Sequence, residues 1–340
     1  MRVSLDDIAR EAQVSKSTVS RVINNFKNID PQTREKVLNI LKKRNYNVNR
    51  LAKHLSQGKG LDVIGVIGGI YDLLGRYYYV EFIRQMEKYL EEKDHALFIF
   101  NVIGDQKSEQ FRKKIDVLCD YYHSRIVKGY IMLAPIENDL KIEYLSKKGV
   151  KGIAIGSRLD DENFGYVDVD SKEGAKKIVT YLIDRGHQKI ALINGYLGLS
   201  SAKEREAAFY EVMKQYKLPI RKEYVTCGFY SREGGRDAAH KLLTLKDPPT
   251  AIFAANDDMA VGVYEAAQTL NLKIPEDISL VGFDNNLEVL AGRKPLLTTM
   301  GQPYAMMGEM AAFYLEREEF SVKSILSPVL IERDSVKNIK

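Results

Sequence analysis

The chain has 340 residues, of which 45% are hydrophobic and 29% charged, and its net charge is +5 at pH 7. It exceeds the length of one typical domain, and no apolar run reaches the roughly 20 residues that a membrane helix needs. The five histidines lack metal-ligand spacing, which argues against a metal site. Only two cysteines, Cys119 and Cys227, are present, and no signal peptide is recognisable, which argues against a disulfide framework and secretion. We therefore expect a cytoplasmic protein without cofactors and with two buried thiols.

The first 60 residues are strongly basic. They hold thirteen Lys or Arg residues and five acidic residues, a net charge of +8, which leaves −3 for the rest of the chain. A basic segment ahead of a mildly acidic body is typical of a protein that binds a polyanion such as DNA.

Two short helices are predicted at the N-terminus, with a tight junction between them. SLDDIAREAQV (residues 4–14) predicts a helix capped by Ser4, and VSKSTVSRVINN (residues 14–25) predicts one capped by Ser15. At 100° per residue, one side of the second helix carries only polar groups, namely Lys16, Ser17, Ser20, Arg21 and Asn24, whereas Val19, Val22 and Ile23 lie opposite. An ordinary amphipathic helix with a solvated face is the alternative, but the basic charge favours a helix-turn-helix whose polar side enters a DNA major groove.

A third helix and a linker complete the N-terminal unit. IDPQTREKVLNILKKRNY (residues 29–46) has Asp30 as a cap and Pro31 at the first helical position, and it closes a small core with Tyr46. The polar residues 47–60 are too few for a core of their own and predict a linker with latent helicity. We therefore expect a headpiece at 1–48, a hinge helix and linker at 49–60, and a core at 61–340.

The core sequence alternates between short β-branched runs and helical segments, in two series. The strands of the first series are VIGVIGG, ALFIFN, GYIMLA and KGIAIG, and those of the second are KIALIN, YVTCGF, TAIFAA and DISLVGF. Helices are expected at 78–93, 108–125, 201–216, 231–245 and 257–270. This alternation predicts an α/β core of parallel sheets covered on both faces, and about 280 residues are enough for two doubly wound lobes.

Polar side chains follow many of the predicted strands, at the carboxyl ends where open parallel sheets bind ligands. They are Asp72, Ser157, Arg158, Arg205, Tyr230, Asn256, Asp257 and Asp284. Carboxylates, guanidinium groups and an aromatic face suit the vicinal hydroxyls of a sugar. Each residue alone also admits a structural role, such as a helix cap for Asn256 or a surface ion pair for Arg205.

The stretches LDDIAREAQVSKSTVSRVIN and TREKVLNILKKRNYNVNRLAKHL resemble the headpiece and hinge of the LacI/GalR family of bacterial transcriptional repressors, and the resemblance continues to the final strand. It implies a helix-turn-helix headpiece and a periplasmic-binding-protein-like core of two lobes. It also implies a sequence-specific repressor of carbohydrate-utilisation genes, homodimeric on a palindromic double-stranded operator and allosterically controlled by a small sugar bound between the lobes.

The resemblance assigns roles to individual residues. Lys16 and Ser17 match positions that discriminate operators, and Leu55 matches a hinge residue that wedges into the minor groove. Arg21 is the best candidate for a guanine contact, because a guanidinium fork matches O6 and N7. The implied DNA-binding residues are Ser4, Ser15, Lys16, Ser17, Thr18, Ser20, Arg21, Asn24, Asn49, Arg50 and Leu55. The implied effector-binding residues are Asp72, Tyr79, Arg158, Arg205, Tyr230, Asn256 and Asp284.

Two alternatives stay open. The same fold could use a purine or a phosphoprotein corepressor, and a sugar-active enzyme could carry an accessory DNA-binding module. Arg158 with Tyr230 and Asp284 favours a neutral sugar. No paired acid and base or nucleophile constellation is present, and GVIGG departs from the dinucleotide motif G-x-G-x-x-G, so we do not expect an enzyme. The tail lacks leucine heptads, which favours a dimer over a tetramer. The sequence identifies neither the effector nor the operator, and it does not say whether the effector acts as an inducer or a corepressor.

Overall fold

The computed structural model describes residues 4–23, 26, 28–44, 46, 63–69, 77–93 and 95–340. The chain divides into two compact units, Met1–Leu61 and Asp62–Lys340, and each is described by itself. The predicted hinge at 49–60 lies outside the described residues. The predicted site residues that also lie outside them are Asn24, Asn49, Arg50, Leu55 and Asp72.

The first unit contains the three predicted helices, α1 (Leu5–Ala12), α2 (Lys16–Ile23) and α3 (Pro31–Lys43). All three predicted caps are present: Ser4 forms a reciprocal capping box with Asp7, Ser15 Oγ accepts from the Thr18 amide at 3.1 Å, and Asp30 accepts from the Thr33 amide at 2.8 Å. One apolar cluster holds the helices together, made of Ile8, Ala9, Ala12, Val19, Val22, Val37 and Leu41, with Tyr46 packed against it.

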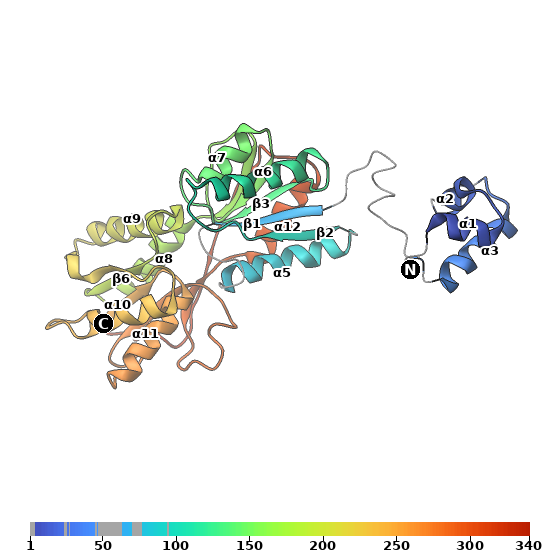
Figure 1. The fold of residues 1–340 in the computed structure, drawn as a ribbon. Helices are drawn as coiled ribbons and strands as arrows, with labels where there is room; N and C mark the ends of the chain where they lie inside the picture. Colours follow the sequence, from blue (N-terminus) through green and yellow to red (C-terminus); the bar gives the residue numbers. More distant parts are fainter. Residues whose placement is uncertain are drawn as a thin grey trace. The chain divides into compact units, whose positions relative to one another are not determined.

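The second unit begins with a lobe built on one parallel sheet, in the strand order β11-β5-β4-β3-β1-β2. In Figure 1, α6 and α7 lie on one side of this sheet, and α5 and α12 lie on the other. We call it the N-lobe. Its elements are β1 (Val63–Gly68), α5 (Tyr77–Glu91), β2 (Ala96–Phe100), α6 (Glu109–His123), β3 (Gly129–Leu133), α7 (Leu140–Lys147), β4 (Gly152–Ile155), β5 (Phe164–Val169), α12 (Tyr304–Glu316) and β11 (Lys323–Leu326).

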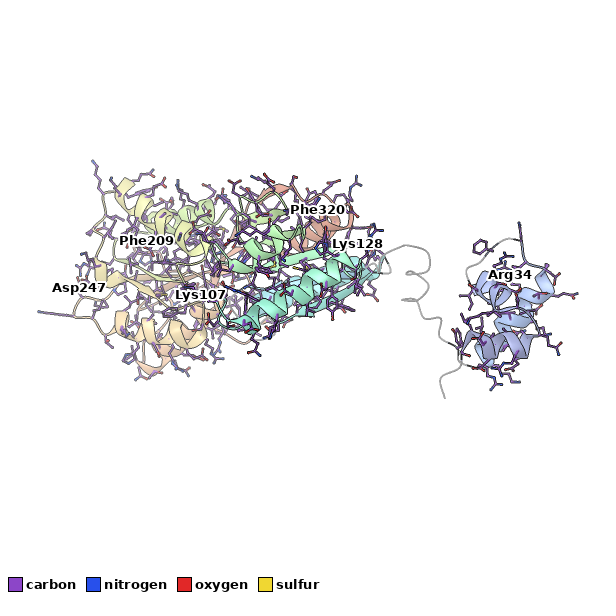
Figure 2. All side chains as sticks on the ribbon, turned by 45° about the horizontal axis from the view of Figure 1, so that its top comes forward. Arg34, Lys107, Lys128, Phe209, Asp247 and Phe320 are labelled. Carbon is purple, nitrogen blue, oxygen red and sulfur yellow. The ribbon has the colours of Figure 1, made fainter. Side chains whose placement is uncertain are left out.

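A second lobe, the C-lobe, is built on the sheet β12-β10-β9-β8-β6-β7, which is parallel except for β12. Its elements are α8 (Ser171–Asp184), β6 (Ile190–Asn194), α9 (Ser200–Gln215), a short 3-10 helix (Lys222–Tyr224), β7 (Val225–Cys227), α10 (Arg232–Leu243), β8 (Ala251–Ala254), α11 (Asp257–Thr269), β9 (Ser279–Asp284), β10 (Thr298–Gly301) and β12 (Val329–Ile331). Each lobe has its own apolar core. Phe320 belongs to the core of the N-lobe and Phe209 to that of the C-lobe, and both residues are labelled in Figure 2.

The chain passes between the lobes three times: after β5, after β10 and after β11. These crossings bring the carboxyl ends of strands from both sheets to the boundary between the lobes. The position of the predicted ligand site follows from this topology, because ligands of open parallel sheets bind at carboxyl ends.

The two cysteines differ from each other. Cys119 is buried as predicted, but the prediction for Cys227 is wrong, because that residue is exposed. It ends β7, a three-residue strand at the sheet edge, and its thiol donates to the Gly195 carbonyl at 3.2 Å. None of the described helices combines the length and the apolar character that crossing a membrane requires.

Candidate functional site

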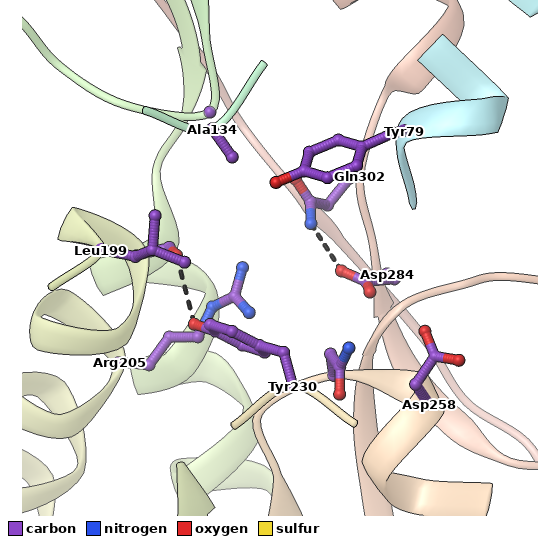
Figure 3. Close-up of a pocket in the computed structure, with 11 residues that line it drawn as sticks. Tyr79, Ala134, Leu199, Arg205, Tyr230, Asp258, Asp284 and Gln302 are labelled. Carbon is purple, nitrogen blue, oxygen red and sulfur yellow. Dashed lines mark hydrogen bonds between the residues drawn. The ribbon is translucent and has the colours of Figure 1, made fainter. Parts of the chain in front are cut away.

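A cavity lies between the N-lobe and the C-lobe (Figure 3). It contains about 540 Å³ of empty space, a figure that includes the solvent at its open mouth. Its lining residues come from both lobes and from one crossing segment: Tyr79, Ala134, Gly156, Leu199, Ser201, Arg205, Tyr230, Asn256, Asp258, Asp284 and Gln302.

Five of the eleven lining residues lie at the carboxyl ends of strands. Ala134 follows β3 and Gly156 follows β4 in the N-lobe. In the C-lobe, Asn256 follows β8, Asp284 ends β9, and Gln302 follows β10 at a crossing. The sequence-based expectation that the strand ends form the ligand site therefore agrees with the geometry of this cavity.

Arg205, on α9, is a buried cation with a fixed orientation. Its guanidinium carbon lies 3.6 Å from the centroid of the Phe283 ring, an arrangement typical of a cation–π contact. One terminal nitrogen donates to the Ala255 carbonyl and the other to Ser171 Oγ at 3.3 Å, whereas Nε has no hydrogen-bond partner among the described residues. The stacking and these two bonds fix the plane of the guanidinium group before any ligand enters.

Asp284 is a buried carboxylate opposite this cation. Its Oδ1 accepts from Gln302 Nε2 at 2.6 Å, and its backbone has a positive φ of 127°. Burial raises the pKa of Asp284 to about 7, while the Arg205 charge pulls that pKa down. The group is therefore balanced between its neutral and ionised forms near neutral pH.

A second buried carboxylate, Asp257, supports the turn that carries Asp284. Its Oδ2 accepts from the Asn286 amide at 2.8 Å, and its Oδ1 accepts from the Thr299 hydroxyl at 2.7 Å. Burial and the nearby Asp284 charge raise the pKa of Asp257 well above its usual value. Asp257 does not line the cavity, so it acts on the site through the backbone of the turn.

Tyr230 provides an aromatic face, and Asn256 provides an amide. The Tyr230 hydroxyl lies 3.2 Å from Ser201 Oγ (Figure 3), and its ring packs over Gly195, where a Cβ would lie only 2.0 Å from ring carbons. Only glycine at position 195 therefore leaves room for this ring. Asn256 Oδ1 accepts from the Met259 amide at 3.0 Å, so this residue caps α11 as well as lining the cavity.

Five of the seven predicted effector residues meet in the cavity: Tyr79, Arg205, Tyr230, Asn256 and Asp284. Arg158 does not, which differs from the expectation. Its Nε lies 3.4 Å from Asp168 Oδ2 in the N-lobe, and its NH1 lies 3.1 Å from Glu204 Oε1 in the C-lobe. Two acidic side chains thus hold Arg158 in a bridge between the lobes and keep it out of the cavity lining.

The sequence reasoning missed several lining residues. Gln302 was not predicted because it follows β10, a strand that was not predicted from the sequence. In the run AANDD, Asn256 and Asp257 were selected as the strand-end residues, and the adjacent Asp258 was not. A strand prediction at TTMG would have found Gln302, because that position follows a carboxyl end. The small residues Ala134 and Gly156 carry no polar signal at all.

The headpiece presents the predicted polar face on α2. Lys16, Ser17 and Arg21 are exposed, and Val19 and Val22 are buried. Ser15 Oγ lies 2.7 Å from Ser17 Oγ and 2.8 Å from Thr18 Oγ1, which orders the hydroxyls at the start of the helix. Lys16 Nζ donates to Asp6 Oδ2 on α1 at 2.9 Å, a contact between exposed side chains.

The raised pKa of Asp284 predicts a pH dependence of stability. The folded chain retains a proton on Asp284 up to about pH 7, whereas the unfolded chain, with the usual pKa of 3.8, has released it, so the free energy of unfolding falls as the pH rises through this window. We expect Asp284→Asn to remove this loss, so that the parent loses roughly 1 to 3 kcal/mol more than the variant between pH 5.5 and 8.

Urea unfolding of both proteins across that pH range measures the difference. His187, whose pKa is lowered by burial, contributes with the opposite sign in both proteins and cancels in the comparison. The Asp284 charge also raises the pKa of Asp257, so the measured difference belongs to the Asp257–Asp284 pair. Identical pH profiles for the parent and the variant would contradict the assignment of a raised pKa to Asp284.

Comparison with known proteins identifies the family. The model of the bacterial regulatory proteins of the lacI family matches residues 4–49, and that of the periplasmic binding protein-like domain matches residues 179–336. The "Probable HTH-type transcriptional repressor ExuR" of Bacillus subtilis (strain 168) is 30% identical over 345 aligned positions, which cover 99% of each protein.

Solved structures agree with this assignment. The lac repressor dimer bound to operator and the anti-inducer ONPF has a TM-score of 0.84 at 25% identity, covering 99% of this chain and 100% of that chain. A complex of the transcriptional regulator CelR with cellobiose has a TM-score of 0.72 at 25% identity, covering 98% and 100%. With its three-helix headpiece and its two-lobed periplasmic-binding-protein-like core, the chain belongs to the LacI family of bacterial regulatory proteins.

Proposed function

We propose that the chain is a sequence-specific transcriptional repressor of carbohydrate-utilisation genes in the bacterial cytoplasm. It binds a palindromic operator as a homodimer, and a small sugar in the interlobe cavity controls its operator affinity. The observation that carries this proposal is the cavity itself, which brings together Arg205, Asp284 and Tyr230 between the lobes of a core whose chain also carries a helix-turn-helix.

The charges in the cavity favour a neutral, hydroxyl-rich ligand. Two carboxylates, Asp258 and Asp284, line it together with one guanidinium, Arg205. A phosphate or another multiply charged anion would meet two carboxylates beside a single cation in a poorly solvated site. Sugar hydroxyls can donate to the carboxylates and accept from the guanidinium, while the Tyr230 ring covers an apolar face of the sugar.

The polar face of α2 is the proposed DNA-reading surface. Lys16, Ser17 and Arg21 are exposed on this face, and Arg21 is assigned to guanine because its fork matches two acceptors. Hydroxyls near the helix starts suit phosphate oxygens. The proposed phosphate contacts at the helix starts are made by Ser4, Ser15 and Thr18, and Ser20 and Asn24 are proposed to contact phosphates or bases. The proposed contacts of the hinge segment are made by Asn49, Arg50 and Leu55.

Contacts between the lobes supply the proposed switch. Arg84 NH1 lies 3.3 Å from Glu288 Oε1, and Arg158 joins Asp168 to Glu204, so both arginines form ion pairs that link the lobes. A sugar that contacts both walls of the cavity changes the balance between two lobe arrangements, and a coupling of about 1 to 3 kcal/mol suffices for strong regulation. We propose that the sugar acts as an inducer, which lowers the affinity of the protein for its operator.

The N-lobe edge strand β2 is the proposed dimer contact. It lies at the edge of the sheet, and two of its own residues, Phe98 and Ile99, are exposed although they are large and apolar. The unpaired backbone groups of an edge strand can pair with another chain, and exposed apolar side chains favour such a contact. Since the similar lac repressor structure is a dimer, a second copy of this chain is the fitting partner.

We expect Phe98→Lys to weaken dimerisation at least about tenfold, because it places a charge in the contact. Analytical ultracentrifugation between 0.1 and 50 µM checks this, with Ile220→Lys as a control at an exposed residue outside the N-lobe. A parental dimer in the Phe98→Lys variant would rule out β2 as the contact.

A thermal-shift screen tests the effector class. The panel contains D-ribose, D-glucose, D-galactose, D-glucuronate, cellobiose, glucose 6-phosphate, adenine and guanine. A neutral sugar at 100 times its dissociation constant should stabilise the core by about 2.7 kcal/mol and raise its melting temperature by roughly 5 °C. Stabilisation by a purine or a sugar phosphate alone would replace the neutral sugar with that ligand class.

A further inference from the structure

Lys141 is a buried lysine in the first turn of α7, and nothing in the proposed effector contacts requires it. Only 1% of the residue is exposed. Its ammonium donates to the Gly69 carbonyl at 2.7 Å and lies 3.1 Å from Asp139 Oδ2, on a side chain that is itself buried. Asp139 also caps α7, because its Oδ1 accepts from the Lys141 amide at 2.9 Å.

A buried ion pair is weak evidence for stability, since an apolar pair of similar volume often stabilises a fold at least as well. What an apolar pair cannot do is hold a carbonyl. Lys141 fixes the backbone at the carboxyl end of β1, where Gly69 lies so close to the next strand end that a Cβ would be 2.1 Å from the Ala134 oxygen. The ammonium therefore positions two adjacent strand ends at once.

Ala134 begins the segment that Asp139 ends, and we call residues 134–139 the bridging loop. Ala134 lines the effector cavity and has a positive φ of 45°, which is unusual for a residue with a Cβ. Its amide donates to the Ile155 carbonyl at 2.8 Å, and the Pro135 carbonyl accepts from Ser157 Oγ at 2.6 Å. The N-lobe thus holds this loop in a defined shape at both of its ends.

The middle of the bridging loop contacts the C-lobe. The Glu137 amide donates to the Gly198 carbonyl at 3.1 Å, and the Glu137 carboxylate forms an ion pair with Lys203 on α9. Gly198 is followed by Leu199, which lines the cavity from the C-lobe side. One loop therefore forms part of the cavity wall and also joins the two lobes beside it.

We propose that the Lys141–Asp139 pair is a positioning device that holds the bridging loop in the geometry needed for sugar binding and for the contact between the lobes. Lys141 touches no ligand and acts through Gly69 and Ala134. This inference rests on the proposed function for its consequence, but the anchoring of the loop stands on the contacts alone.

The test uses the full chain with Asp139→Asn and Lys141→Met combined. The asparagine keeps the α7 cap and removes the charge that Lys141→Met alone would leave buried and unpaired. The control is Lys147→Met, which removes an exposed lysine from the same helix. Hydrogen exchange at the amides of Ala134 and Glu137 reports the loop directly, and titration with the panel compound that stabilises the parent most reports the cavity.

We expect exchange at these two amides to be at least tenfold faster in the double variant than in the parent, with a melting temperature within a few degrees and at least tenfold weaker binding of that compound. The control should match the parent throughout. Parental protection of both amides, or a parental dissociation constant in the folded double variant, overturns the proposal. If no panel compound binds the parent, the sugar assignment fails, and the exchange experiment still decides the anchoring role.

Discussion

Asp284→Asn should weaken effector binding while leaving operator binding in the absence of the effector unchanged. At pH 8 the Asp284 carboxylate is ionised, and hydrogen bonds from sugar hydroxyls to such an acceptor are each worth about 1.5 to 3 kcal/mol. Losing one of them weakens binding roughly 10- to 150-fold. Asparagine tolerates a positive φ as aspartate does, so the turn keeps its conformation.

Isothermal titration with the sugar found in the screen measures the affinity, and fluorescence anisotropy with labelled operator measures DNA binding. Asp237→Asn, at an exposed residue of α10, is the matched control, because it makes the same chemical change outside the cavity. A variant that responds to the sugar with parental affinity would show that Asp284 does not contact the ligand.

Arg21→Ala should lose operator discrimination while retaining effector binding. A bidentate arginine–guanine contact contributes about 1 to 3 kcal/mol of discrimination per half-site, so we expect a loss of roughly 5- to 150-fold at each half of the palindrome. Val19 and Val22 remain to hold α2 on the headpiece core, so the helix itself should stay folded.

Selection from randomised palindromes, followed by anisotropy at fixed salt, checks this. Arg10→Ala is the control for the loss of one positive charge, because Arg10 lies on α1, exposed and paired with Asp7. The control should weaken specific and non-specific binding alike, whereas Arg21→Ala should reduce their ratio. An unchanged ratio in Arg21→Ala would remove this residue from the reading surface.

Local chemistry made much of the fold predictable. Ser4, Ser15 and Asp30 were recognisable as caps, and each accepts the expected amide hydrogen bond. The core strands were recognisable because they are buried on both faces and read as continuous apolar runs. The buried strand β5 (FGYVDV) was not predicted, because Gly165 and Asp168 interrupt its apolar run. The strands β10, β11 and β12 were not predicted either, since pairing across the crossings, rather than their short sequences, determines where they lie.

The candidate site was predictable where a polar residue follows a readable strand, as for Asn256 and Asp284. Arg158 shows the limit of that reasoning. Its position after β4 is as expected, but Asp168 and Glu204, from two distant parts of the chain, direct its guanidinium to the lobe boundary. Burial raises the pKa of Asp168 to about 6 and also raises that of Glu204, so this bridge holds two acids around one cation. No local pattern contains that information.

Operator binding with and without the sugar tests whether the chain is a sequence-specific repressor that a sugar controls. A palindrome selected from random DNA is compared with a shuffled duplex by anisotropy at one salt concentration. We expect the selected palindrome to bind about a thousandfold or more tighter than the shuffled duplex, and the sugar to change this affinity at least about fivefold. Equal affinity for both duplexes, in the presence and in the absence of every panel compound, would contradict it.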